Sequence, residues 1–187
     1  MVVLISFTLS GCFRSIDSLS RDISKSQQNL KENTSYTFAI SPSYATNAER
    51  PSINDLGRYF SLYEQNGKYI RITPKFNSHE LIIELLDTNK QKLNEKKFPL
   101  QPYSKEFIDK SKFGYKKFYF TTNKEIIKKS THCVADLGQS CSFHTTQIFL
   151  DKDENLVITD KSTDIGLIFL IPVSGKSSYL HIFDRIE

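Results

Sequence analysis

Apolar and polar residues alternate in short runs from about residue 35 onward, and turn-forming residues separate the runs. Alternation with a period of two is typical of strands that bury one face. About 8–11 short runs of this kind follow one another at regular spacing. The pattern therefore predicts a mainly β fold, a single antiparallel β-barrel or β-sandwich over residues 35–187.

Turn chemistry marks several hairpins between these runs. Asn66-Gly67 follows the alternating segment 58–64, and this dipeptide between two runs is a strong hairpin signal. Residues 88–91 separate a second pair of runs. The longest apolar run, 165–173, is interpreted as a buried strand, and residues 175–177 as the hairpin turn that follows it.

Two segments depart from the strand pattern. Ser104 can cap a helix and Gly114 can end one, so a short helix is predicted near residues 105–113. Residues 12–34 are rich in Ser, Lys, Asp and Gln, with a weak helical stripe of apolar residues. This composition predicts a polar tether with partial helical character.

Composition agrees with one β-rich domain. A chain of 187 residues has room for one ordinary domain and a short N-terminal appendage. The apolar residues are mostly strand formers, with fourteen Phe and nine Tyr but one Met and no Trp. No stretch of eighteen consecutive apolar residues occurs, so no membrane-spanning helix is predicted.

The first residues have features of a targeting signal. Residues 2–9 are apolar apart from Ser6 and Thr8, which is the length of the hydrophobic region of a secretory signal. The next residues complete the sequence Leu9-Ser10-Gly11-Cys12. This sequence resembles the lipobox of bacterial lipoproteins, in which an aliphatic residue and two small residues precede a cysteine.

The resemblance implies a lipid-anchored protein of the bacterial envelope. Residues 1–11 would be a signal peptide that is cleaved before Cys12, and Cys12 would carry the diacylglyceryl group and its palmitate-type chains. Each buried CH₂ contributes about 0.8 kcal/mol, so several acyl chains give a lasting anchor. Since Phe13 and not Asp follows the cysteine, the resemblance implies the outer membrane, with the domain facing the periplasm.

Once Cys12 is assigned to the anchor, two cysteines remain. In an oxidising exported compartment, Cys133 and Cys141 are expected to pair in a disulfide bond. A zinc site formed with His132 and His144 is the alternative. His132 and Cys133 are neighbours, and in a strand their side chains point to opposite faces, so the disulfide is favoured.

Other motif-like stretches lack required residues. A calcium loop starting at Asp151 needs Gly at its sixth position and Glu at its twelfth, where the chain has Leu156 and Ser162. A phosphate-binding loop ending at residues 175–177 would need Gly where the chain has Leu170. No catalytic, cofactor-binding or metal-binding residue is therefore predicted.

Residues 90–129 hold twelve Lys against four acids, a difference of +8. In an exported protein this Lys-rich region could contact an envelope protein or an anionic envelope component, and not nucleic acid. The alternative is that its aromatic residues face inward and its lysines form a solvated outer face, as strand alternation would produce.

Three functions are compatible with these features. The favoured one is a non-catalytic interaction domain on a lipid anchor. The second is a barrel for a small apolar ligand, since Gly57-Arg58-Tyr59-Phe60 resembles the Gly-x-Trp opening of lipocalins. The third is an envelope hydrolase, which needs a histidine in a cleft beside an acid and a hydroxyl. The candidate histidines are His79, His132, His144 and His181.

Overall fold

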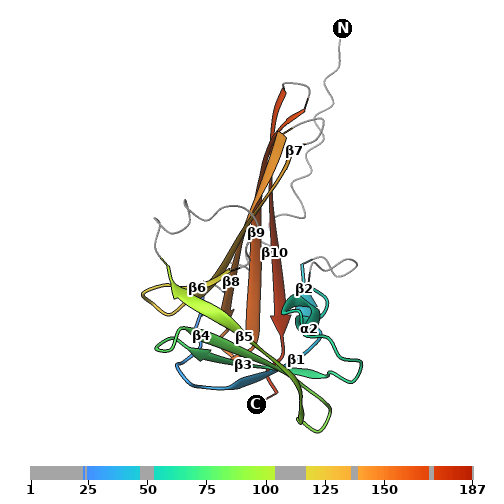
Figure 1. The fold of residues 1–187 in the computed structure, drawn as a ribbon, viewed down its shortest axis with the longest axis vertical. Coiled ribbons are helices and arrows are strands. Elements are labelled where there is room, and N and C mark those ends of the chain that lie inside the picture. Colours follow the sequence, from blue (N-terminus) through green and yellow to red (C-terminus); the bar gives the residue numbers. More distant parts are fainter. Residues whose placement is uncertain are drawn as a thin grey trace.

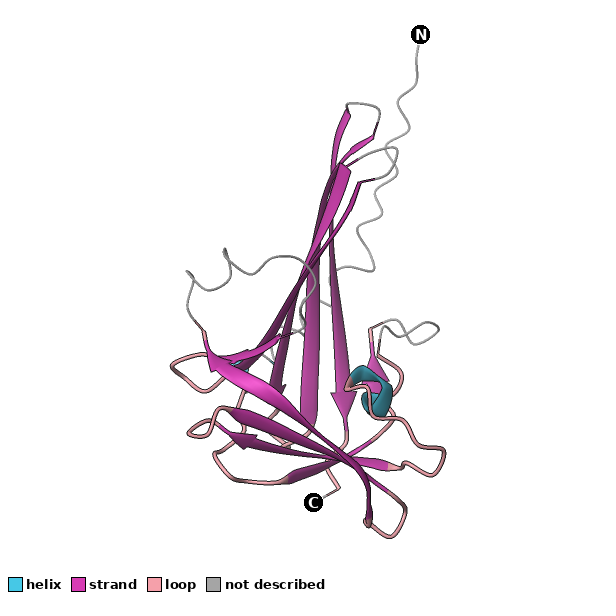
Figure 2. Ribbon diagram, viewed as in Figure 1, coloured by secondary structure: helices cyan, strands magenta, loops and turns pink. Residues whose placement is uncertain are grey.

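One sheet of ten strands makes up most of the chain (Figures 1 and 2). The computed structural model describes residues 23, 25–46, 53–103, 117–135, 139–168 and 171–186, and the statements below refer to them. The elements are β1 (Tyr36–Ala39), β2 (Tyr44–Ala45), α2 (Leu56–Tyr59), β3 (Tyr69–Lys75), β4 (Glu80–Leu86), β5 (Lys92–Pro102), β6 (Lys117–Phe120), β7 (Ile126–Ala135), β8 (Gln139–Leu150), β9 (Leu156–Ile168) and β10 (Ile171–Phe183). The predicted mainly β fold with 8–11 strands is confirmed.

The strands follow the order β1-β3-β4-β5-β6-β7-β8-β9-β10-β2. The pairings are antiparallel with one exception, β5 and β6, which run parallel with Leu100 opposite Phe118. The prediction of a purely antiparallel sheet is therefore wrong at this point. A parallel pair needs a connection of a dozen or more residues, and the chain between Pro102 and Lys117 provides that length.

The first strand also contacts the chain that follows the last strand. Phe38 forms an isolated antiparallel bridge with Arg185. The Ala39 N–H donates to the Asp184 carbonyl at 2.9 Å, and the Ile186 N–H donates to the Thr37 carbonyl at 2.8 Å. The sheet order itself is open, with β1 and β2 at its two edges.

Four long strands rise out of this sheet, and we call β7–β10 the blade. They contain 10, 12, 13 and 13 residues, so the longest extend about 40 Å at the usual rise per residue. In Figure 1 one half of the blade lies against the shorter strands and α2, and the other half projects away from them. We call this first half, together with the shorter strands, α2 and their connections, the base. The blade end is the far part with Phe143 on β8 and residues 165–168 and 171–174 of β9 and β10.

The hydrophobic core lies at the base. Its largest fully buried side chains are Phe38, Phe60, Phe76, Phe183, Leu30, Leu56, Ile70, Ile72, Leu81, Ile83, Leu85 and Leu86. The ring of Phe60 lies 6.1 Å from that of Phe98 and 6.1 Å from that of Phe118, and the latter two are 5.2 Å apart. Centroid distances of this size belong to packed aromatic pairs, so aromatic rings fill the space between the strands.

The base of the blade is buried on both faces. Phe183 on β10 belongs to the main core, while its neighbour Leu180 packs with Phe149 and Val157 in a second, smaller cluster. Ile23 covers that second cluster. A segment close to the N-terminus therefore shields the face of the blade that points away from the main core.

Part of the predicted tether belongs to this folded base. Leu30 is 2% exposed, and Gln28 exchanges backbone hydrogen bonds of 2.8 Å with Leu150. The folded part of the chain thus begins before residue 35. The predicted signal peptide 1–11, Cys12, the first part of the tether and the predicted helix at 105–113 lie outside the described residues.

The segment 58–64 is not the predicted strand. Asp55 caps α2, because its Oδ1 accepts the Arg58 N–H at 2.9 Å. The short helix ends at Phe60, and Ser61 follows with a φ of 58°. A side-chain cap and a left-handed residue thus override the alternating pattern, and no hairpin forms across Asn66-Gly67.

Other predicted turns are confirmed. Between β4 and β5, Asp87 Oδ1 accepts the N–H groups of Asn89 and Gln91, each at 2.8 Å. Between β8 and β9, Asp151 Oδ1 accepts the N–H groups of Asp153 and Asn155, each at 2.9 Å. The carboxylate that opens the calcium-like stretch therefore holds a polar hairpin turn together.

The apolar run 165–173 is not one buried strand. It crosses from β9 into β10, and pairing continues from Ile171 opposite Ile168 down to Phe183 opposite Leu156. Residues 175–177, predicted as a turn, lie inside β10. Ile165 is 54% exposed and Val173 is 40% exposed, so the first and last residues of this run lie outside the core.

Candidate functional site

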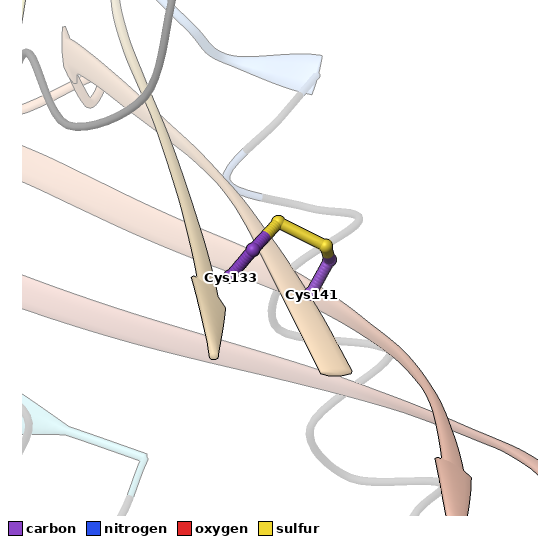
Figure 3. The surroundings of a disulfide bond; sticks show 2 residues. All are labelled: Cys133 and Cys141. Carbon is purple, nitrogen blue, oxygen red and sulfur yellow. A yellow bond between two sulfur atoms is a disulfide. The ribbon is translucent and has the colours of Figure 1, made fainter. Parts of the chain in front are cut away.

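The two predicted disulfide cysteines meet near the blade end. Cys133 on β7 and Cys141 on β8 stand directly opposite each other, with their Cα atoms 4.0 Å and their sulfur atoms 2.05 Å apart. Figure 3 shows the bond joining the two strands close to where they end. The two cysteine sulfurs that the alternative zinc site would need are thus bonded to each other. In the described part of the chain, no three His, Cys, Asp or Glu side chains are arranged to hold a metal ion.

The histidines required by the hydrolase hypothesis are scattered. His79 lies in the turn between β3 and β4, where its ring is 5.8 Å from that of Phe120. The backbone of His132 belongs to β7, and His144 lies on β8. His181 is buried in the base on β10, with 1% exposure.

Among the described side chains, His144 lies near an acid and hydroxyl groups. Its Nδ1 is 4.0 Å from Asp160 Oδ2, which is longer than a hydrogen bond, and Asp160 Oδ1 accepts the Thr146 hydroxyl at 3.3 Å. Ser162 stands opposite His144 on β9. Its hydroxyl is 2.6 Å from that of Ser177, and no hydrogen bond links His144 to either of these two described serines.

A catalytic serine needs a base within hydrogen-bond reach, and that base needs an orienting partner. The residue types are therefore adjacent here, but the hydrogen bonds that would activate Ser162 are missing. These side chains form a polar stripe along the blade between the core and the blade end.

Two buried titratable groups close to this stripe are neutral. Burial raises the pKa of the Tyr59 hydroxyl well above its ordinary value. Burial also lowers the pKa of His181, against a smaller opposing effect of the Asp160 charge. His181 Nε2 accepts the Ile53 N–H at 3.1 Å, so this imidazole supports the chain before α2.

Lysines of the Lys-rich region cover aromatic rings. The Lys128 Nζ lies 4.1 Å from the centre of the Tyr59 ring and 5.5 Å from that of Phe118. Lys96, Lys124 and Lys129 lie in the same way over Phe98, over Phe76 and Phe120, and over Tyr103, at 4.9 to 5.2 Å. Such contacts contribute about 0.5–1 kcal/mol at exposed sites. Lys128 stands directly opposite Phe118, and Lys96 lies two residues before Phe98, so each lysine shares a face with the ring that it covers. The expected separation of inward aromatics from outward lysines does not hold for these two pairs.

The blade end carries exposed apolar side chains away from the core. Phe143 on β8 is 44% exposed. Ile165 on β9 and Val173 on β10 are exposed as well, as described above. Sequence reasoning missed this feature, because an apolar run alone does not say whether it is buried. Residues 165–175 contain no charged side chain, and this was the signal in the sequence that could have pointed to the feature.

A pocket lies beside the second cluster, on the face of the blade that points away from the main core. Ile23, Gln27, Thr46, Gln147, Phe149, Thr159, Lys161, Ser178, Tyr179 and Leu180 line it. Its volume is about 50 Å³. Pockets for organic ligands usually measure roughly 300–1,000 Å³, so this one has room for a few waters at most.

Comparisons with known proteins found no match for this chain. No family model matches it, and neither does a curated protein or a solved structure. Within the described residues, no helix is both long and apolar enough to cross a membrane.

Proposed function

We propose that this chain is a bacterial envelope lipoprotein whose β domain is a non-catalytic interaction module. Cys12 would carry the lipid after removal of residues 1–11, and Phe13 favours the outer membrane with the domain in the periplasm. The observation that carries the interaction role is the projecting blade end, which exposes Phe143, Ile165 and Val173 outside the core. Exposed apolar groups that are gathered away from a core are typical of binding surfaces.

The interior of the base supports this role over binding of a small apolar ligand. The rings of Phe60, Phe98 and Phe118 are in contact where a ligand cavity would be needed. The finer fold that we propose for the base is a small filled barrel. The hydrogen bonds between β1 and residues 184–186 support it, because they give β1 a partner on its second side.

The described polar groups give less support to a hydrolase. His144 has Asp160 as its nearest acid at 4.0 Å, and Ser162 bonds to Ser177. We also propose that the Lys-rich region contributes to contacts with anionic envelope components, as a secondary surface. Exposed lysines attract anions over about 10 Å at moderate ionic strength, so their effect would weaken as salt is added.

The anchor is tested by metabolic labelling with radioactive palmitate. The wild-type chain should incorporate label, and Cys12→Ser should lose it together with cleavage of the signal peptide. Cys141→Ser is the matched control, since it replaces a different cysteine of the same chain and should keep the label. Label that persists in Cys12→Ser would refute the lipobox assignment.

The interaction role is tested by placing a photo-crosslinking amino acid at position 165, with position 63 as the control. Tyr63 is 61% exposed and lies in the base, so both positions tolerate a bulky group. We expect adducts with envelope components from position 165 and few from position 63. Equal adducts from both positions would remove the blade end from the binding surface.

A further inference from the structure

Exposed apolar side chains occur on both faces of the blade end. Ile165 stands opposite Ser174, and Val173 stands opposite Gly166 one position further along. Directly opposite residues share a face and successive residues alternate, so Ile165 and Val173 point to opposite sides. A protein partner that packs on a sheet covers one face. A lipid environment surrounds both, and this pattern favours lipid.

Cations stand behind this apolar end on one face. Phe143, Thr163 and Lys176 share the face of Ile165, because β8, β9 and β10 are in direct register there. Lys161 lies on the same face, four residues from Ile165, and both lysines are exposed. At about 3.3 Å per residue, the lysines lie roughly 7 and 13 Å behind Ile165.

The acids of this part of the blade point the other way. Asp160 and Asp164 immediately precede Lys161 and Ile165, so they belong to the opposite face. On the face of the lysines, Ile165 lies nearest the end, Phe143 and Lys176 are level with each other behind it, and Lys161 follows further back. That order matches a leaflet, where hydrocarbon lies inside a layer of phosphate headgroups.

The chain before Ile23 is long enough to bring the anchor to the same membrane. Ile23 packs against Leu180 in the base. Leu180 is six residues from Ser174 along β10, or about 20 Å. Ile23 is eleven residues along the chain from Cys12, and eleven extended residue steps span at most about 36–40 Å. The acyl chains on Cys12 and the blade end can thus enter one leaflet.

We propose that the blade end inserts into the lipid leaflet that holds the acyl chains of Cys12, with Lys161 and Lys176 at anionic headgroups. This inference rests on the proposed lipid anchor. Residues 165–174 contain no ionisable side chain, and the four described residues on each strand, 165–168 and 171–174, extend about 13 Å. Half of a hydrocarbon core about 30 Å thick has a similar depth.

The absence of tryptophan from the chain allows a direct test. Ile165→Trp introduces a single indole at the blade end, Val173→Trp provides a second position there, and Tyr63→Trp is the control in the base. Each full-length protein is purified from membranes and reconstituted in vesicles of phosphatidylcholine and phosphatidylglycerol. Lipids with brominated acyl chains are the quencher, and flotation shows that the protein is on the vesicles.

We expect the indoles at positions 165 and 173 to emit at shorter wavelength and to lose most of their fluorescence to the brominated lipid. The indole at position 63 should do neither. Lys161→Gln combined with Lys176→Gln should reduce quenching in vesicles that contain phosphatidylglycerol. The same change should have little effect in pure phosphatidylcholine, because the lysines contact the anionic headgroups.

Failure of this inference is distinguishable from failure of the anchor. Protein that floats with the vesicles, while the indoles at 165 and 173 stay solvent-exposed, overturns insertion and leaves the anchor intact. Quenching that appears only after envelope protein is added assigns the blade end to a protein partner and also overturns insertion. Loss of palmitate label alone refutes the anchor, and quenching in the unlabelled chain would still support insertion.

Discussion

Replacing Phe60 by alanine tests whether the base is filled. Phe60 is 1% exposed, and its ring contacts those of Tyr59, Phe98 and Phe118 at centroid distances of 4.9, 6.1 and 6.1 Å. Truncating a buried Phe to Ala removes burial and leaves a cavity, which together cost about 3–5 kcal/mol. The three aromatic contacts place Phe60→Ala in the upper part of that range.

The assay is thermal unfolding with and without benzene. For a chain of this size, each kcal/mol lowers Tm by about 2–4 °C, so Phe60→Ala should unfold roughly 6–20 °C below the wild type. An apolar cavity binds benzene, so benzene should raise the Tm of this variant and leave the wild type unchanged. Tyr63→Ala, at a 61% exposed position, should change stability by no more than about 0.5 kcal/mol.

Two results would refute this reasoning about the interior. A loss below about 1 kcal/mol would mean that Phe60 is not packed as described. Stabilisation of the wild type by benzene would mean that the base already contains an apolar cavity. The second result would move the function toward binding of a small apolar ligand, with the blade as its support.

Two further predictions concern the disulfide and the buried histidine. Replacing Cys133 and Cys141 together by serine opens a nine-residue loop and should lower the free energy of unfolding by about 2–3 kcal/mol. The loss is measured as a shift of the urea midpoint. An unchanged midpoint under oxidising conditions would contradict this prediction. Burial lowers the pKa of His181, so the unfolded chain binds the proton more readily and stability should fall as pH drops through about 6.5. His181→Gln keeps an acceptor for the Ile53 N–H and should reduce the difference in Tm between acid and neutral pH. A difference equal to that of the wild type would assign the pH effect to other groups.

Local signals predicted the strands and turns that they encode directly. Leu81, Ile83 and Leu85 alternate with half-buried residues along β4, and all three are fully buried in the core. The turns at Asp87 and Asp151 form because each carboxylate satisfies two backbone N–H groups. Features that depend on a few adjacent residues were therefore accessible from the sequence.

Features that depend on distant contacts were not. The segment 58–64 alternates as a strand does, yet Asp55 caps a helix there and Ile53 bonds to His181, more than a hundred residues away. The parallel pairing of β5 with β6 needs two strands that are separated by a long connection. A period of two states which residues share a face and does not state which partner covers that face.

The apolar run 165–173 shows the same limit where it matters most for function. The hydrophobic effect disfavours contact of this run with water and does not specify whether protein or lipid provides the alternative. The sequence alone suggested that the run lies in the core, because apolar runs of soluble domains are usually buried there. The ladder from Ile171 to Phe183 places it beyond the core, with Ile165 and Val173 on opposite faces. No described part of the fold covers Ile165 and Val173. Under the lipid anchor that we propose at Cys12, a membrane would lie within reach of the same chain and would remove these side chains from water.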